Sequence, residues 1–219
     1  MGIAEGVLET GFAARNGPVL SAAGLSKRFR GRRVLDGVDL ALPGGCIAGI
    51  TGENGSGKTT LLRVLLGDLR PDAGQVLLGG SYGYCPQVPV LHPSLTVAQH
   101  LVLFRTAYRL TGTQRAEVLI DRLNFASCLA QEAGALSGGT QQKLNLTLAL
   151  MHDPDVLLLD EPYQGFDHET YQVFWELAAE LRDRGRTVLV VTHFVPDSTP
   201  FDVLLTLSGG RLAVARDAR

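Results

Sequence analysis

The sequence predicts an α/β fold whose core is a mainly parallel sheet, with an antiparallel β subdomain before it and an α-helical subdomain inserted into it. Residues 156–159 and 188–191 are continuous apolar runs, and residues 169–184 between them have the pattern of an amphipathic helix. Strands that are apolar on both faces and alternate with helices are typical of a parallel sheet covered on both sides. These two runs and the helix between them therefore predict the core.

The remaining segments predict the rest of the architecture. Short apolar stretches broken by glycines over residues 19–42 indicate antiparallel strands with tight turns. Residues 95–150 show helical periodicity with few β-branched runs, and we place the inserted helical subdomain at about residues 88–150. Residues 1–17 lack sustained periodicity and are expected to form a disordered tail, which leaves residues 18–219 as one domain.

Composition narrows the classes of partner. The chain has 219 residues, 45% of them hydrophobic, and its 20 Lys+Arg against 22 Asp+Glu give a net charge of −2, so nucleic acid is not expected as a ligand. Its three cysteines have no metal-binding spacing, which argues against a zinc site or a disulfide framework. Its apolar runs fall short of the ~18 residues that a membrane span requires, so we expect no span in this chain.

A glycine-rich loop carries the strongest functional signal. Residues 52–59, Gly-Glu-Asn-Gly-Ser-Gly-Lys-Thr, match the Gly-x-x-x-x-Gly-Lys-Ser/Thr pattern between a predicted strand at 46–51 and a predicted helix at 60–66. Glycine torsions let successive N–H groups turn inward and form a nest for phosphate oxygens at the helix N-terminus. We expect Lys58 to reach the β- and γ-phosphates of a nucleotide and Thr59 to ligate Mg²⁺, whereas a plain glycine-rich turn is the alternative. The predicted contacts here are Gly52, Glu53, Asn54, Gly55, Ser56, Gly57, Lys58, Thr59 and Thr60.

Two acidic residues and a histidine follow the apolar strands. Asp160 and Glu161 come directly after the run 156–159, and the carboxyl ends of strands in open α/β sheets are where ligands bind. We expect Asp160 to hold Mg²⁺ through its water shell and Glu161 to orient or deprotonate an attacking water. His193 ends the next strand at the same edge and is expected to contact the γ-phosphate. An acidic loop start and a surface histidine are the alternatives.

At Leu136-Ser137-Gly138-Gly139-Thr140 the chain resembles the ATP-binding subunit of ABC transporters, and the resemblance covers about residues 19–214. By itself, a Ser-Gly-Gly sequence that opens a helix at 140–151 is either an anion site or an ordinary N-cap at Ser137. The resemblance implies a P-loop NTPase core of the RecA-like type, with ATP and Mg²⁺ as cofactors. It also implies a head-to-tail dimer, in which Ser137, Gly138, Gly139 and Thr140 of one chain cover the nucleotide held by a second, identical or related, ATP-binding subunit. Thr140 departs from the usual Gln.

Three more residues gain roles from the resemblance. Phe29 matches the aromatic residue that stacks on adenine, or is simply a strand residue in a small core. Gln87 matches the glutamine that contacts Mg²⁺ and couples the site to the membrane partner, or is a polar turn residue. Asp167 matches the residue that links the two sites of the dimer. The metal ligands implied are Thr59, Gln87 and Asp160. The family usually has a short helix at the segment corresponding to residues 194–200, but this segment contains two prolines, so no helix is expected there.

The resemblance implies an ATP hydrolase in which Glu161, His193 and Lys58 act on the γ-phosphate. Transport would require a separate transmembrane permease subunit, with this chain bound at the cytoplasmic face of the membrane, and export of small molecules is preferred over import. Two alternatives stay open. One is a soluble ABC ATPase of repair, translation or iron–sulfur assembly, and the other is a nucleotide sensor that does not hydrolyse ATP.

Overall fold

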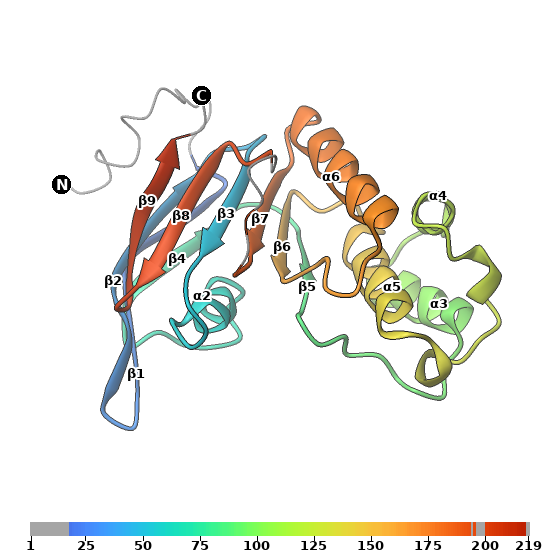
Figure 1. Cartoon of the computed structure of the whole chain (residues 1–219), viewed down its shortest axis with the longest axis horizontal. Coiled ribbons are helices and arrows are strands. Elements are labelled where there is room, and N and C mark those ends of the chain that lie inside the picture. The colour runs from blue at the N-terminus through green and yellow to red at the C-terminus, as the bar shows by residue number, and fades with distance from the viewer. Residues whose placement is uncertain (1–17, 194, 196–199, 218–219) are drawn as a thin grey trace.

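The computed structural model describes residues 18–193, 195 and 200–217. The expected tail at 1–17 lies outside the described residues, as does most of the segment 194–200 in which no helix was expected. The expected α/β architecture is confirmed, with a mainly parallel sheet, a separate antiparallel sheet and a group of helices on one side (Figure 1).

The antiparallel sheet is built from β1 (Leu20–Phe29), β2 (Arg32–Leu42) and β4 (Ala73–Leu78), in the order β2-β1-β4. Arg30 and Gly31 link the first two strands with φ values of 48° and 84°. Two residues with positive φ make the type of hairpin turn whose twist matches that of the flanking strands, and Phe29 consequently pairs with Arg32.

The larger sheet has six strands in the order β5-β6-β7-β3-β8-β9, of which only the β8–β9 pair is antiparallel within the described chain. Its members are β5 (Tyr82–Cys85), β6 (Val156–Asp160), β7 (Thr187–Val191), β3 (Ile47–Thr51), β8 (Val203–Ser208) and β9 (Arg211–Asp217). The strands β8 and β9 were not predicted from the sequence. The strands β6, β7 and β3 lie side by side in the middle of the sheet and are almost completely buried, as their continuous apolar sequences predicted.

Alternate residues of the central strands serve two different cores. Val156 and Leu158 of β6 pack with α2 (Lys58–Leu65), which lies between the two sheets. Leu157 and Leu159 of the same strand pack on the opposite face, against the helices. Because side chains alternate along a strand, each central strand contributes to both cores.

The helical side comprises α3 (Val97–Ala107), α4 (Gln114–Arg122), α5 (Gly138–Leu150) and α6 (His168–Asp183), with short 3₁₀ turns η1 (Ala126–Cys128) and η2 (Ala133–Ala135). Thr96 and Gln99 form a capping box that starts α3. The helix α5 packs against α3, α4 and β5, whereas α6 lies along β7 and β3 (Figure 1). No helix within the described ranges has the length and apolar character needed to cross a membrane.

Ion pairs connect α4 to the start of the parallel strands. Arg115 lies 2.6 Å from Asp153, and Arg186, just before β7, lies 2.9 Å from the other oxygen of Asp153. Arg186 also pairs with Asp155, which in turn accepts hydrogen bonds from the backbone N–H and hydroxyl of Ser81 at 2.8 and 2.9 Å. The bond from the Ser81 backbone is the main reason that the pKa of Asp155 is lowered. This network joins three segments at the edge of the sheet opposite to the glycine-rich loop.

Candidate functional site

Four neighbouring parallel strands end at the same edge of the sheet and place most of the predicted residues there. In the order β5-β6-β7-β3, the first strand is followed by Gln87, the second ends at Asp160 and is followed by Glu161, the third is followed by His193, and the fourth by the glycine-rich loop 52–57. The carboxyl edge of a parallel sheet is where α/β proteins bind ligands. The topology therefore explains why residues more than 130 positions apart meet.

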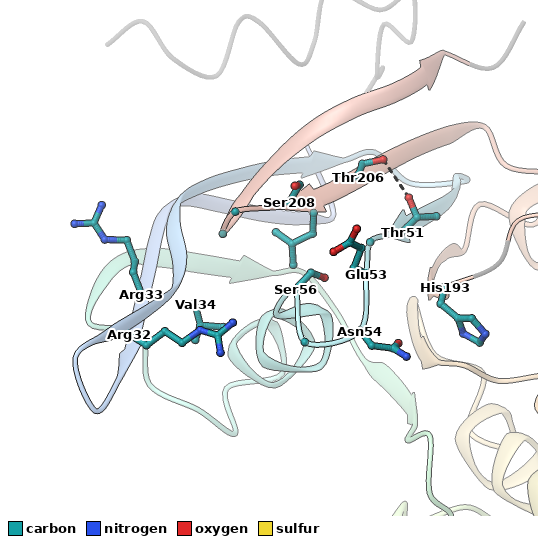
Figure 2. Close-up of a pocket in the computed structure, with 15 residues that line it drawn as sticks. Arg32, Arg33, Val34, Thr51, Glu53, Asn54, Ser56, His193, Thr206 and Ser208 are labelled. Atoms are coloured by element: carbon teal, nitrogen blue, oxygen red, sulfur yellow. Dashed lines mark hydrogen bonds between the residues drawn. The ribbon is translucent and has the colours of Figure 1, made fainter.

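A pocket of about 640 Å³ opens at this edge. Of the predicted site residues it is lined by Phe29, Asn54, Gly55, Gly57, Lys58, Thr59, Thr60, Gln87, Asp160, Glu161 and His193. A second hollow of about 860 Å³ shares Asn54, Gly55 and His193 with this pocket and is also lined by Gly52, Glu53 and Ser56 together with residues 206–210 (Figure 2).

Two positions in the loop require glycine. Gly52 has a φ of +153°, and a Cβ there would lie 2.4 Å from the Leu207 carbonyl oxygen. Gly57 has a φ of +107°, and its Cβ would lie 2.9 Å from Val34 Cγ1. The close contact at Gly52 cannot be relieved by rotating a side chain, because the obstacle is a backbone atom. The glycines of the motif are therefore explained by the path of the chain.

Lys58 and Ser56 supply donors that fit a polyphosphate. The Lys58 side chain is 8% exposed, and its Nζ donates hydrogen bonds to the carbonyl oxygens of Gly52 at 2.7 Å and Glu53 at 3.1 Å. Ser56 Oγ is buried and has no hydrogen-bond partner among the described residues. Both groups lie at the start of α2, where the backbone N–H groups and the helix dipole favour an anion.

Thr59 and Asp160 supply oxygens that fit a divalent cation. Thr59 Oγ1 donates to Asp160 Oδ2 at 2.9 Å, and burial raises the pKa of Asp160. A buried carboxylate of this kind is stabilised by a bound cation. The described residues contain no group of three or more His, Cys, Asp or Glu side chains that could hold a metal ion. Mg²⁺ at this site would therefore also need Gln87, water or phosphate oxygens as ligands.

Glu161 is held in a strained and well-defined position. It is 5% exposed and has a φ of +49°, an uncommon value for a residue with a side chain. Its Oε1 lies 2.6 Å from His193 Nδ1, and its Oε2 accepts a hydrogen bond from Thr192 Oγ1 at 3.2 Å. Tyr163 donates to the same Thr192 oxygen at 2.7 Å. Glu161 and His193 were predicted from the sequence as site residues, whereas Thr192 and Tyr163 were not.

Phe29 lies at the mouth of the pocket and is 45% exposed, so its ring is available to a ligand. Arg32, its cross-strand partner, lines both hollows and was also missed by the sequence analysis. In Figure 2 the Arg32 side chain extends from β2 towards the loop. An exposed ring beside a cation, next to phosphate donors, is an arrangement suited to a nucleotide.

The comparisons with known proteins agree with this geometry. The family model described as "ABC transporter" matches residues 35–164. The chain belongs to the ABC transporter family. A Nod factor export ATP-binding protein I from Ralstonia nicotianae is 36% identical over 211 residues, which make up 89% of this chain and 65% of that protein. Another from Burkholderia pseudomallei is 37% identical over 80% of this chain and 62% of its own length. The chain thus spans less than two thirds of these two relatives.

Solved structures give the same fold. The structure of an ATP-binding subunit of an ABC transporter has a TM-score of 0.84 and 25% identity, with 90% of each chain covered. A dimeric bacterial ABC transporter cassette has a TM-score of 0.81 and 24% identity, and it covers 90% of this chain and 97% of its own. The chain therefore has the fold of an ABC transporter cassette and belongs to a family that binds ATP, generally with Mg²⁺, and hydrolyses it.

Two parts of the predicted ABC transporter site lie outside both hollows. Ser137 is the N-cap of α5 and accepts a hydrogen bond from the Thr140 N–H at 3.2 Å. Asp167 is the N-cap of α6, and the bond from the Thr170 N–H lowers the pKa of Asp167. The two helix starts touch each other, because a Cβ on Gly139 would lie 2.5 Å from the Gly165 carbonyl oxygen. Within one chain, both segments have a capping role and neither reaches the pocket.

Proposed function

We propose that this chain binds Mg·ATP in the 640 Å³ pocket, hydrolyses it, and so powers export through a separate membrane protein. The observation that carries the proposal is that Lys58, the Thr59–Asp160 pair and the Glu161–His193 pair all line this one pocket. Phosphoryl transfer requires the same three functions, namely a cation on the phosphates, oxygen ligands for Mg²⁺ and a base for water.

The proposed reaction assigns one task to each group. Thr59, Asp160 and Gln87 would hold Mg²⁺, which would supply positive charge to offset that of the phosphates. Lys58 exchanges its carbonyl partners for phosphate oxygens, and Glu161 accepts a proton from water as the water oxygen bonds to the γ-phosphorus. The bond from that phosphorus to the β–γ bridging oxygen breaks, and this oxygen leaves with ADP. His193 holds one oxygen of Glu161 and lines the same pocket, which supports the proposed contact of His193 with the γ-phosphate.

We further propose that two such sites form between two ATP-binding subunits. Ser137, Gly138, Gly139 and Thr140 would cover the nucleotide of the second subunit, and Asp167 would lie between the sites. This proposal is supported by the exposed position of Ser137 and Gly138 outside the chain's own pocket and by the dimeric cassette among the similar structures. The domain limits 18–219, with a helical subdomain at 88–150, belong to the same proposal.

Export, a transmembrane permease subunit and attachment at the cytoplasmic face are proposed from the relatives. Those from Ralstonia and Burkholderia are named export ATP-binding proteins. A Dictyostelium discoideum ABC transporter G family member is 30% identical over 88% of this chain, which corresponds to 28% of that protein. Gln87 and the neighbouring exposed Val88 and Val90 are the proposed contact with the permease.

ATP hydrolysis by the purified full chain tests the proposal. We expect Lys58→Ala and Glu161→Gln to lower kcat by about 100-fold or more, the usual contribution of a catalytic base. Glu176→Gln is the matched control, because Glu176 is exposed on α6 and lies 3.6 Å from Arg122, far from the pocket. Hydrolysis that survives in Lys58→Ala, or a wild-type chain that binds ATP without hydrolysing it, would overturn the catalytic assignment.

The partner is tested separately. We expect the full chain to co-purify with an integral membrane protein encoded with it. Nucleotide-dependent binding to ribosomes or DNA would instead support an ABC ATPase outside transport.

A further inference from the structure

A chain of two hydroxyl groups leads to the oxygen of Glu161 that does not face His193. Tyr163 OH donates to Thr192 Oγ1 at 2.7 Å, and Thr192 Oγ1 donates to Glu161 Oε2 at 3.2 Å. His193 Nδ1 lies 2.6 Å from the other oxygen, Oε1. Thr192 and His193, the two residues that follow β7, therefore hold both carboxylate oxygens of Glu161, the proposed base.

The chemistry of these groups determines which of them donates in each hydrogen bond. An ionised carboxylate only accepts hydrogen bonds, so the single hydroxyl proton of Thr192 points towards Glu161. Thr192 can then only accept from Tyr163, which must act as the donor. Burial raises the pKa of Tyr163 to about 12, so this phenol keeps its proton at neutral pH. Donation into the Thr192 oxygen makes that hydroxyl a stronger donor in turn, because chained hydrogen bonds polarise one another.

The phenol is itself held by aromatic packing. The Tyr163 ring lies 5.2 Å from that of Tyr171 and 5.7 Å from that of Phe174, both on α6. Tyr163 therefore connects the loop after β6, the end of β7 and α6. Glu161 lies two residues before it in a backbone conformation that costs free energy, and such strain persists only where the surroundings fix it.

We propose that Tyr163 is a positioning residue for the ATPase reaction, which acts through Thr192 to hold the Glu161 carboxylate towards the attacking water. This inference rests on the proposed function, because it requires Glu161 to be the base. It assigns Tyr163 no contact with ATP, since Tyr163 does not line the pocket.

Tyr163→Phe tests the role of the hydroxyl alone. We expect kcat to fall about fivefold, the equivalent of the ~1 kcal/mol of one hydrogen bond, with KM for ATP changed less than twofold. Tyr171→Phe is the matched control, because its hydroxyl is buried in the same aromatic cluster and has no hydrogen-bond partner among the described residues. We expect Tyr171→Phe to retain the wild-type kcat.

A double-mutant cycle tests whether Tyr163 acts through Thr192. Thr192→Val removes the relay, so Tyr163→Phe should lower kcat no further in that background, whereas Thr192→Ser should restore most of the rate. Multiplicative losses in the double variant, an unchanged kcat in Tyr163→Phe, or equal losses in Tyr163→Phe and Tyr171→Phe would each overturn the inference. Wild-type hydrolysis and its loss in Glu161→Gln report separately on the proposed function.

Discussion

Two adjacent glycines at the start of α5 are expected to respond to alanine in opposite ways. A Cβ on Gly139 would lie 2.5 Å from the Gly165 carbonyl oxygen, whereas no described atom lies within 4 Å of a Cβ on Gly138. Neither residue has a positive φ, so backbone strain does not enter the comparison. The pair therefore isolates the contact between the start of α5 and the loop before α6.

The size of the effect follows from the contact. Gly139→Ala must separate the two backbones by about 0.9 Å to reach the ordinary contact distance of 3.4 Å. Overpacking of this kind costs about 1–3 kcal/mol, offset by up to ~1 kcal/mol from the better helix propensity of Ala. Gly138→Ala gains the propensity term without the steric cost. We expect Gly139→Ala to be less stable than Gly138→Ala by about 1–3 kcal/mol.

Urea unfolding of the full chain without nucleotide measures this difference directly. Thermal unfolding should show the same order, with melting temperatures separated by several degrees at roughly 2–4 °C per kcal/mol for a chain of this length. Equal midpoints for the two variants, or a lower midpoint for Gly138→Ala, would refute the reasoning. Such a result would mean that the loop around Gly165 moves away from α5 at little cost.

Two further predictions concern carboxylates. Burial raises the pKa of Asp160, so the ionised form of this side chain destabilises the folded chain. Asp160→Asn should therefore raise the melting temperature measured without nucleotide. The same substitution should abolish the further rise in melting temperature that Mg·ATP causes. A lower melting temperature for the variant would contradict this. The hydrogen bond from the Ser81 backbone lowers the pKa of Asp155, so its stabilisation is present above the unfolded-state value of about 3.9 and is lost as the pH falls through the folded-state pKa. Because the Asp155 side chain is 40% exposed, solvent screens this interaction, so Asp155→Asn should cost at most about 1 kcal/mol at pH 7 in urea unfolding, and this cost should shrink below about pH 4. If the stability lost in Asp155→Asn were the same at every pH, the effect would come from the changed shape of the side chain and not from its charge.

Much of the site could be predicted because its signals are local. The spacing within residues 52–59 and the acids directly after the apolar run 156–159 depend only on neighbours in the sequence. The predicted parallel sheet places these strand ends at one edge, whereas the strand order that makes them neighbours was not predicted. Ser137 as an N-cap was also correct, since Ser followed by a helix is a local pattern as well.

The parts that were missed depend on contacts between distant segments. Arg32 lines the pocket because the hairpin register places it opposite Phe29, and that register follows from a turn at Arg30 and Gly31. Tyr163 and Thr192 meet only because β6 and β7 are neighbours. The strand β8 is less deeply buried than the central strands, so its sequence gives a weaker pattern, although Gly209 and Gly210 marked the turn that follows.

The division of β6 between two cores has an evolutionary consequence. Substitutions at Val156 or Leu158 alter the packing beneath the glycine-rich loop, whereas substitutions at Leu157 or Leu159 alter the packing beneath α5 and α6. A lineage can therefore remodel the helical half by changing every second residue of the strand. The half that grips the nucleotide would be inherited intact, since the residues that support it point the other way.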